Sequence, residues 1–427
     1  MSSFHLRGGE MHAESVSLDT IAAAVGTPAY VYSADALRRS AQRFRAALGK
    51  IPRKQLMFAV KANPSLAVLR VLADQNYGAD IVSGGELSCA LRAGITANHI
   101  VYSGVGKTAP ELIAALDAGI GRFNLELERE GQLLSALATQ RGRRAPALLR
   151  INPDVDASTH AKITTGRSNS KFGIPLDEAT RMYDRLAALP GLDLHGLAVH
   201  IGSQITDIGP LETAYRKIGD LIRVLRQKGH RVYHVDLGGG LGVAYKPGQV
   251  DADVETYGAM VANVTRDWDV TLLFEPGRFI AAHAGVLLTR VLWVKPGARL
   301  PFVVVDAAMN DLARPALYDA WHEFGAVRPS GKRFTASIVG PICESGDTFA
   351  TERMIDMVDE GDLALFHTAG AYGASMASTY NCRPLVPEVL VDGNRFAVVA
   401  ERVAPHDLRP QRLAPWMTVK EPLASAA

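Results

Sequence analysis

Between about residues 38 and 280, hydrophobic and polar positions follow a repeating order along the chain. Short apolar, β-prone segments alternate with longer Ala- and Leu-rich segments of helical periodicity, such as GELSCALRAG and PELIAALDAG. The eight apolar segments are QLMFAV, ADIV, HIVY, RFNLE, ALLRI, GLAVH, VYHVDL and TLLFE. Eight strands joined by seven helical connections are typical of a (β/α)8 TIM-type barrel, which we expect over residues 38–281. A doubly wound open sheet is the alternative fold.

After about residue 281 the helical periodicity mostly disappears. Segments such as GVLLTRVLWVK, LPFVVVDA, RFTASIVG and RFAVVAERV are strand-like and are joined by short polar links. This pattern predicts an all-β domain of sandwich or barrel type over residues 282–427. Residues 1–37, which contain the strand-like segment TPAYVYS, are expected to join it.

Composition and charge exclude several classes of function. The 427 residues are 48% hydrophobic and 21% charged, and 46 basic against 44 acidic residues leave a net charge of +2. This balance gives no long-range field for nucleic acid or a membrane surface. No run approaches the ~18 apolar residues of a spanning helix. The N-terminus lacks the apolar core of a signal peptide, and three scattered cysteines form neither a disulfide framework nor a zinc-ligand pattern. We therefore expect a cytoplasmic protein without a metal site.

Polar and glycine residues recur at the C-terminal ends of the predicted strands. Active sites of (β/α)8 barrels collect at this end. The residues found there are Lys61, Asp80, Ser83, Asn124, Asn152, His200, Gly238, Gly239, Gly240 and Glu275. Any one of them could be a cap or a turn residue, but their recurrence at one rim favours a site. The Ser-, Thr- and Lys-rich stretch Asp156–Gly173 is expected to be a loop over that site.

The stretch FAVKANP places Lys61 at the end of a buried strand. Asn63 is expected to cap the following helix, with Pro64 in its first turn. A buried ammonium is costly unless it is paired, neutralised or used chemically. A lysine whose head group reaches solvent at the strand rim is the structural alternative.

Two further motifs follow the seventh and eighth predicted strands, where barrels of this type often bind phosphate. The glycines of DLGGGLG, including Gly239 and Gly240, allow backbone N–H groups to approach a ligand. In EPGR, Glu275 would point into the barrel mouth, where a protonated pyridine nitrogen is a suitable partner. Gly277 and Arg278 complete that motif, and the guanidinium could clamp a carboxylate.

A third motif, HIGSQ, places His200 and Ser203 at another strand end. The histidine could stack on a flat ring or shuttle protons, and the serine could contact a phosphate. A lysine, a glutamate, a glycine loop and a partner for a flat ring together indicate pyridoxal 5′-phosphate. The lysine would form a Schiff base, and the ring would serve as an electron sink.

The predicted β domain adds polar and aromatic detail in its loops. MNDLARPALY contains Arg314 and Tyr318, GPICESGD contains Cys343 and Glu344, and GAYGASMASTYN contains Tyr372. Each could be an ordinary solvated loop residue, and Cys343 a small buried thiol. Together they suggest that this domain is more than a scaffold.

Seven ordered motifs, FAVKANP, HIGSQ, DLGGGLG, EPGR, DAAMNDLARPALY, GPICESGD and GAYGASMASTYN, closely resemble those of meso-diaminopimelate decarboxylases. These carboxy-lyases are alanine-racemase-like pyridoxal-phosphate enzymes built from a barrel and a β domain. The resemblance covers nearly the whole chain. It implies decarboxylation of meso-2,6-diaminopimelate at its D-centre to L-lysine and CO2, the last step of lysine biosynthesis.

The resemblance also implies roles for individual residues and an assembly. Lys61 would hold the cofactor, His200 would stack on its ring, and Cys343 would donate a proton during catalysis. The cofactor would further contact Ser203, Gly239, Gly240, Glu275, Gly277, Arg278 and Tyr372. The amino-acid substrate would contact Arg278, Arg314, Tyr318, Glu344 and Tyr372. Cys343 and Glu344 would reach the site from a partner subunit, which implies a homodimer with shared active sites.

Three other readings stay open at this point. Related decarboxylases act on ornithine, arginine or lysine, which lack a distal carboxylate. An amino-acid racemase of the same fold would need a second proton-transfer group, for which Tyr318 and Tyr372 are candidates. A non-catalytic homologue should have lost Lys61 or Cys343, and the chain retains both.

Overall fold

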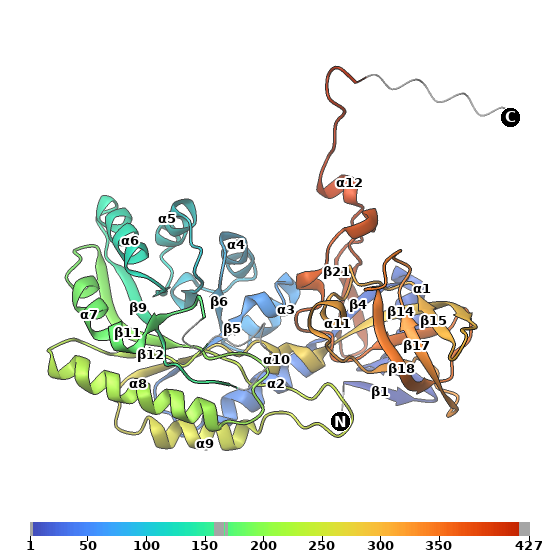
Figure 1. Cartoon of the computed structure of the whole chain (residues 1–427), viewed down its shortest axis with the longest axis horizontal. Helices are drawn as coiled ribbons and strands as arrows, with labels where there is room; N and C mark the ends of the chain where they lie inside the picture. Colours follow the sequence, from blue (N-terminus) through green and yellow to red (C-terminus); the bar gives the residue numbers. More distant parts are fainter. Residues whose placement is uncertain (1–2, 158–165, 167–169, 418–427) are drawn as a thin grey trace.

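The computed structural model describes residues 3–157, 166 and 170–417. The chain forms two lobes, a barrel surrounded by helices and a β domain whose strands are mostly antiparallel (Figure 1). Most of the predicted loop Asp156–Gly173 lies outside the described residues.

The eight predicted parallel strands are present and close into a barrel. Each strand pairs with its neighbour in chain order, and β13 pairs with β5 to complete the ring. This closure excludes the open doubly wound sheet. The strands are β5 (Lys54–Ala59), β6 (Gly78–Ile81), β7 (Ile100–Tyr102), β8 (Arg122–Leu125), β9 (Ala145–Asn152), β11 (Leu192–Val199), β12 (His234–Asp236) and β13 (Thr271–Phe274). A short additional strand, β10 (Ile174–Pro175), pairs with β9.

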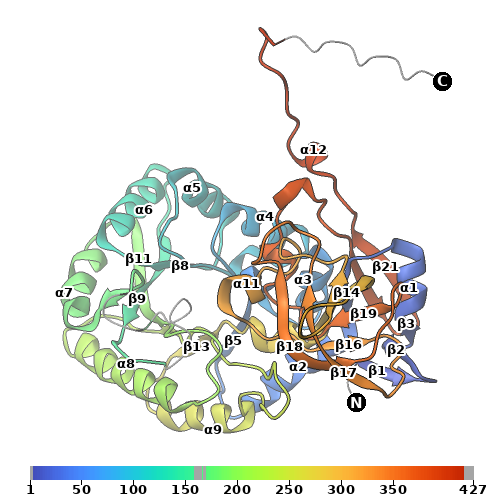
Figure 2. The ribbon, with the colours of Figure 1, turned by 45° about the vertical axis from the view of Figure 1, so that its right-hand side comes forward.

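Helices surround these strands, as Figure 2 shows. Their apolar residues recur at helical spacing, so that α8 buries Leu211, Tyr215, Ile218 and Ile222 along one face. The helices are α2 (Ala34–Ala47), α3 (Leu66–Ala73), α4 (Gly84–Arg92), α5 (Ala109–Ala118), α6 (Glu128–Gln140), α7 (Leu176–Ala187), α8 (Gly209–Gln227), α9 (Val254–Val264) and α10 (Arg278–Ala281). Among the described residues, no helix is both long and apolar enough to cross a membrane.

The β domain is organised around a sheet in which an early and a late part of the chain meet. β4 (Ala29–Ser33) lies between β14 (Gly285–Lys295) and β20 (Glu388–Asp392). The other strands of this sheet are β15 (Phe302–Val305), β16 (Phe324–Ala326), β17 (Arg333–Val339), β18 (Thr348–Asp356), β19 (Leu363–Phe366) and β21 (Arg395–Ala400). Outside it lie β1 (Phe4–Arg7), β2 (Glu10–Ala13), β3 (Val16–Ser17), α1 (Leu18–Val25), α11 (Arg314–Tyr318) and α12 (Pro405–Leu408).

The two lobes are joined immediately beside Lys61. The Asn63 side chain donates to the Gly370 carbonyl over 3.0 Å, and the Tyr372 N–H donates to the Ala62 carbonyl over 2.8 Å. A continuous apolar core also extends from the barrel into the β domain. The prediction that Asn63 caps the next helix is wrong, because α3 begins at Leu66 and Asn63 is used to hold the β domain.

Candidate active site

Two adjoining cavities lie at the C-terminal ends of the barrel strands, and both are lined by Lys61, His200 and Glu275. One has a volume of about 360 Å³ and reaches the β domain. The other, of about 380 Å³, is lined mainly by barrel strands and their loops. The first cavity brings together these predicted site residues: Lys61, His200, Ser203, Gly240, Glu275, Gly277, Arg278, Arg314, Tyr318 and Tyr372.

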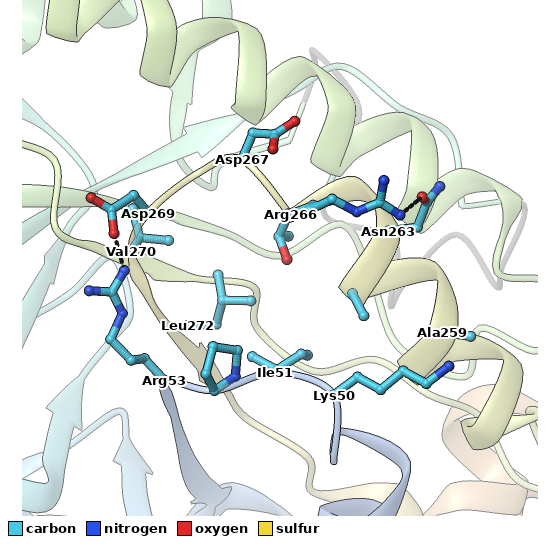
Figure 3. Close-up of a pocket in the computed structure, with 13 residues that line it drawn as sticks. Lys50, Ile51, Arg53, Ala259, Asn263, Arg266, Asp267, Asp269, Val270 and Leu272 are labelled. Carbon is cyan, nitrogen blue, oxygen red and sulfur yellow. Dashed lines mark hydrogen bonds and ion pairs between the residues drawn. The ribbon is translucent and has the colours of Figure 1, made fainter.

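A larger cavity, of about 650 Å³, lies at the opposite end of the barrel, where β5 and β13 begin (Figure 3). Two of its arginines already have partners, since Arg53 pairs with Asp269 and Arg266 donates to the Asn263 side chain. No residue predicted to bind a ligand lines it. We therefore assign the chemistry to the C-terminal end of the barrel.

Lys61 lies on a single 3-10 turn, Val60–Ala62, directly after β5. Its Nζ atom donates to Oδ2 of Asp80 over 3.0 Å, and Asp80 is fully buried at the end of β6. Burial lowers the pKa of Lys61, but Asp80, with smaller contributions from Tyr372 and Glu275, raises it above the ordinary value. The structure thus pairs the ammonium without removing it from the cavity, because 38% of the side chain stays accessible.

Glu275 follows β13 and is buried, and its Oε1 atom has no hydrogen-bond partner among the described residues. Burial, reinforced by the nearby carboxylates of Asp236 and Asp80, raises the pKa of Glu275 well above its ordinary value. Asp236 itself is satisfied, since it accepts from the Asn124 side chain and from the Gly238 N–H, each over 2.9 Å. The Oε1 atom of Glu275 is therefore the carboxyl oxygen that requires a further partner, and a cationic one would stabilise the ionised form of Glu275.

The GGG loop after β12 lies so close to two other loops that side chains would not fit. A Cβ atom on Gly239 would lie 2.2 Å from the Glu275 carbonyl oxygen, and one on Gly240 would lie 2.5 Å from that of Gly202. The Gly239 N–H donates to Nδ1 of His200 over 3.3 Å. Burial, with the charges of Arg150 and Lys61, lowers the pKa of His200 well below its ordinary value, so the ring is neutral.

Arg278 begins α10 and is only 7% exposed. Its Nη2 atom donates to the Ser203 hydroxyl over 3.2 Å, and its Nη1 atom donates to the Tyr245 hydroxyl over 2.7 Å. The guanidinium also lies 4.7 Å from the centre of the Tyr372 ring. Arg278 thus joins the HIGSQ motif, the loop after β12 and the β domain at one point.

Arg314 reaches the same cavity from α11 of the β domain and is 6% exposed. Within the described residues, neither Arg278 nor Arg314 forms an ion pair, and the side chains that accept their hydrogen bonds are neutral. Buried guanidinium groups without a carboxylate are costly. The two guanidinium groups are therefore suited to an anionic group of a ligand, and Tyr318 and Tyr372 line the same cavity.

Cys343 and Glu344 stand apart from the other predicted residues. Both are exposed, and neither lines either cavity of the single chain. Glu344 accepts a hydrogen bond from the Tyr380 hydroxyl over 2.7 Å. The structure therefore does not bring them to Lys61 within one chain.

Three residues in or beside the cavities were not among the sequence-predicted site residues. Asp80 is predicted only as a strand-end residue, although it holds Lys61. Arg150 lines the cavity of about 380 Å³ and pairs with Glu126 over 2.6 Å. Tyr245 lies beyond the glycines of its loop, where no local pattern marks it. The strand-end rule could have found Asp80 and Arg150, but nothing in the sequence signals the contact between Tyr245 and Arg278.

The chain resembles known proteins over nearly its whole length. The family model described as "Pyridoxal-dependent decarboxylase, pyridoxal binding domain" matches residues 34–282. A diaminopimelate decarboxylase from Zymomonas mobilis is 50% identical over 421 residues, which cover 98% of this chain and 100% of that protein. One from Aquifex aeolicus is 41% identical and covers 93% of this chain and 94% of that protein.

A solved structure agrees with this relationship. The diaminopimelate decarboxylase of M. jannaschii in complex with L-lysine has a TM-score of 0.92 and 33% sequence identity. The match covers 96% of this chain and 98% of that one.

Proposed function

The chain belongs to the diaminopimelate decarboxylases within the pyridoxal-dependent decarboxylase family, and from that premise we propose which residues carry the reaction. The reaction is decarboxylation of meso-2,6-diaminopimelate to L-lysine and CO2, the last step of lysine biosynthesis, with pyridoxal 5′-phosphate as the cofactor. The observation that carries the proposal is the cavity lined by Lys61, which Asp80 holds, and by Glu275, whose buried Oε1 atom has no hydrogen-bond partner among the described residues.

The residues around the cavity fit this cofactor. Lys61 supplies the amine for the covalent bond, and the buried Oε1 atom of Glu275 suits a protonated ring nitrogen. The neutral His200 suits a flat ring face. A phosphate would be held by Ser203, Gly239, Gly240, Gly277 and Arg278, with Tyr372 beside them. When bound, pyridoxal phosphate supplies the sink for the electron pair that CO2 loss leaves behind.

Asp80 and Lys61 control the proton nearest the reacting centre. The 3.0 Å ion pair keeps a proton on the Lys61 amine whenever that amine is not covalently engaged. Asp80 is fully buried, so the free ammonium stays at the barrel mouth. Lys61 would have to lose this proton before its amine could take the place of the product amine when L-lysine leaves.

The two unpaired arginines orient the substrate. Arg278 and Arg314 bind the distal carboxylate, and Tyr318 and Tyr372 contact the chain between the two ends of the substrate. This arrangement keeps the arginines away from the departing carboxylate, which must remain poorly solvated for CO2 to leave. A substrate without a distal carboxylate, such as ornithine, would leave two buried cations unpaired.

A second copy of the chain completes the site in this proposal. Cys343 donates the proton that replaces CO2, and Glu344 binds the distal ammonium, both from the partner subunit of a homodimer. Support comes from their exposure and from their position outside the cavities of their own chain. We also expect the enzyme in the cytoplasm, in keeping with three unpaired cysteines.

A substrate panel tests this function. The cofactor-loaded protein is offered meso-diaminopimelate, L-ornithine, L-arginine and L-lysine, and the products are identified by mass spectrometry. Decarboxylation of diaminopimelate alone at enzymatic rates is expected. Faster turnover of ornithine or arginine would reassign the substrate. Interconversion of stereoisomers without CO2 release would favour the racemase.

A further inference from the structure

Arg314 is held by a histidine that has no assigned role in the reaction. The Nη1 atom of Arg314 donates to Nε2 of His322 over 2.8 Å, and both side chains are buried. His322 follows α11 and is 1% exposed. The contact therefore involves a ring that is shielded from water and directed at one of the two arginines of the carboxylate receptor.

The ring of His322 is fixed as a neutral acceptor. Its Nδ1 atom lies 2.9 Å from the His367 carbonyl oxygen, which can only accept, so Nδ1 carries the proton. Burial, together with the charge of Arg314, lowers the pKa of His322 to about 3. Nε2 is then a lone-pair acceptor throughout the neutral pH range. The backbone is held as well, because Arg353 donates to the His322 carbonyl.

Tyr245 holds Arg278 in the same manner. Its hydroxyl accepts from Nη1 of Arg278 over 2.7 Å, while its ring lies 4.5 Å from the Arg314 guanidinium. The rings of Tyr245 and His322 meet edge to face with centroids 5.4 Å apart. Tyr245 therefore contacts both arginines and the histidine that holds one of them.

Elsewhere in the barrel, an arginine is oriented by a carboxylate. Arg150, which lines the cavity of about 380 Å³, is bound by Glu126 over 2.6 Å. A carboxylate at residue 322 would orient Arg314 equally well, but it would cancel the charge that attracts an anionic ligand. A neutral acceptor fixes the guanidinium and leaves its charge available.

We propose that His322 and Tyr245 are positioning residues that determine specificity, because they orient Arg314 and Arg278 through neutral acceptors and preserve their attraction for the distal carboxylate. The inference rests on the proposed function of the two arginines. It adds that the acceptors on His322 and Tyr245 must be neutral for the enzyme to prefer substrates with a distal carboxylate over those without one.

Two variants of nearly equal shape separate orientation from charge. His322→Gln keeps a neutral acceptor, and His322→Glu adds a negative charge. Dissociation constants for the cofactor-loaded protein are measured by calorimetry with L-lysine and with cadaverine. L-lysine, bound as the reaction product, keeps the carboxylate of the L-centre at its distal end, whereas cadaverine has no carboxylate. His195→Gln is the matched control, since it removes another buried histidine, which lies in the middle of β11.

We expect wild type, His322→Gln and His195→Gln to bind L-lysine within about threefold of one another. His322→Glu should weaken L-lysine binding about ten- to a hundredfold, the range of one charge-assisted hydrogen bond, without weakening cadaverine. The absorbance of the bound cofactor should be unchanged. Equal L-lysine affinity in the Gln and Glu variants would overturn the proposal.

Tyr245→Phe is the second variant, and it tests the proposal even if His322→Glu does not fold. It removes the hydroxyl that holds Arg278 but keeps the ring beneath Arg314. L-lysine binding should weaken about tenfold, while cadaverine binding stays unchanged. Equal effects on both ligands would contradict the inference. If wild type itself binds L-lysine no more tightly than cadaverine, the arginine receptor of the proposed function fails instead.

Discussion

The Nζ atom of Lys61 lies 3.0 Å from the Oδ2 atom of Asp80, a carboxylate with no exposed surface. This ion pair explains how Lys61 can follow a buried strand and still present its positive charge to the cavity. Its effect is to keep Lys61 protonated while the ammonium remains accessible.

Asp80→Asn should lower the pKa of Lys61, because burial then acts without the opposing carboxylate. Pyridoxal phosphate bonds only to the neutral amine, so its incorporation into the apoenzyme should become fast at a lower pH. The rate of cofactor incorporation, followed by absorbance across a pH series, measures this shift. A midpoint that does not move by at least about one pH unit would count against the role of Asp80.

Glu275→Gln should lower kcat about 100-fold or more, because an amide cannot stabilise a protonated ring nitrogen by charge. KM for diaminopimelate should change little, since the role proposed for Glu275 is toward the ring nitrogen of the cofactor and not toward the distal end of the substrate. Steady-state kinetics with cofactor-saturated protein measures both values. Glu275→Asp, which keeps the charge, is the control and should retain more activity than Glu275→Gln.

The raised pKa of Glu275 also predicts how the stability of the apoenzyme changes with pH. The pKa of Glu275 is raised in the folded state, so folding binds a proton that the unfolded chain loses above about pH 4.5. Glu275 therefore contributes an unfolding free energy that decreases as the pH rises above that value. Thermal unfolding between pH 5 and 8 should show a steeper loss of Tm in wild type than in Glu275→Gln. Parallel curves would contradict the raised pKa.

At the opposite end of the barrel, the half-buried His234 predicts loss of stability toward acid. Burial, with the charges of Arg122 and His195, lowers the pKa of His234 to about 3. Below about pH 6.5 the unfolded chain binds a proton that the folded imidazole does not, so stability is lost as the pH falls. His234→Gln should reduce this loss by roughly 1 kcal/mol at pH 5, after allowance for partial solvent screening. Chemical denaturation at pH 7 and pH 5 measures the difference.

The proposed sharing of active sites between subunits predicts complementation between inactive variants. Lys61→Ala retains Cys343, and Cys343→Ala retains Lys61, so a mixed dimer contains one complete site. An equal mixture that exchanges freely should recover about a quarter of wild-type activity, because about half the dimers are mixed and each has one of two sites. No recovery, with subunit exchange verified by mass spectrometry, would place Cys343 outside the shared site.

The repeating pattern of apolar segments was sufficient to predict the barrel, because period and spacing determine which segments become parallel strands. Lys61, Glu275 and Arg278 could be singled out for a related reason, since the end of a barrel strand carries the site. Contacts across the two lobes could not be predicted. The hydrogen bond between His322 and Arg314 depends on how the segment after α11 folds back, and no sequence pattern around either residue indicates the other as its partner. The use of Asn63 to hold Gly370, in place of a helix cap, was missed for the same reason.

The most direct test follows the D-centre carboxylate of meso-diaminopimelate labelled with carbon-13. With the cofactor-loaded protein, we predict labelled CO2 and unlabelled L-lysine in equal amounts, and neither product from Lys61→Ala. Absence of L-lysine from wild-type protein that carries the cofactor, or equal turnover by Lys61→Ala, would contradict the assignment of this cavity as the decarboxylation site.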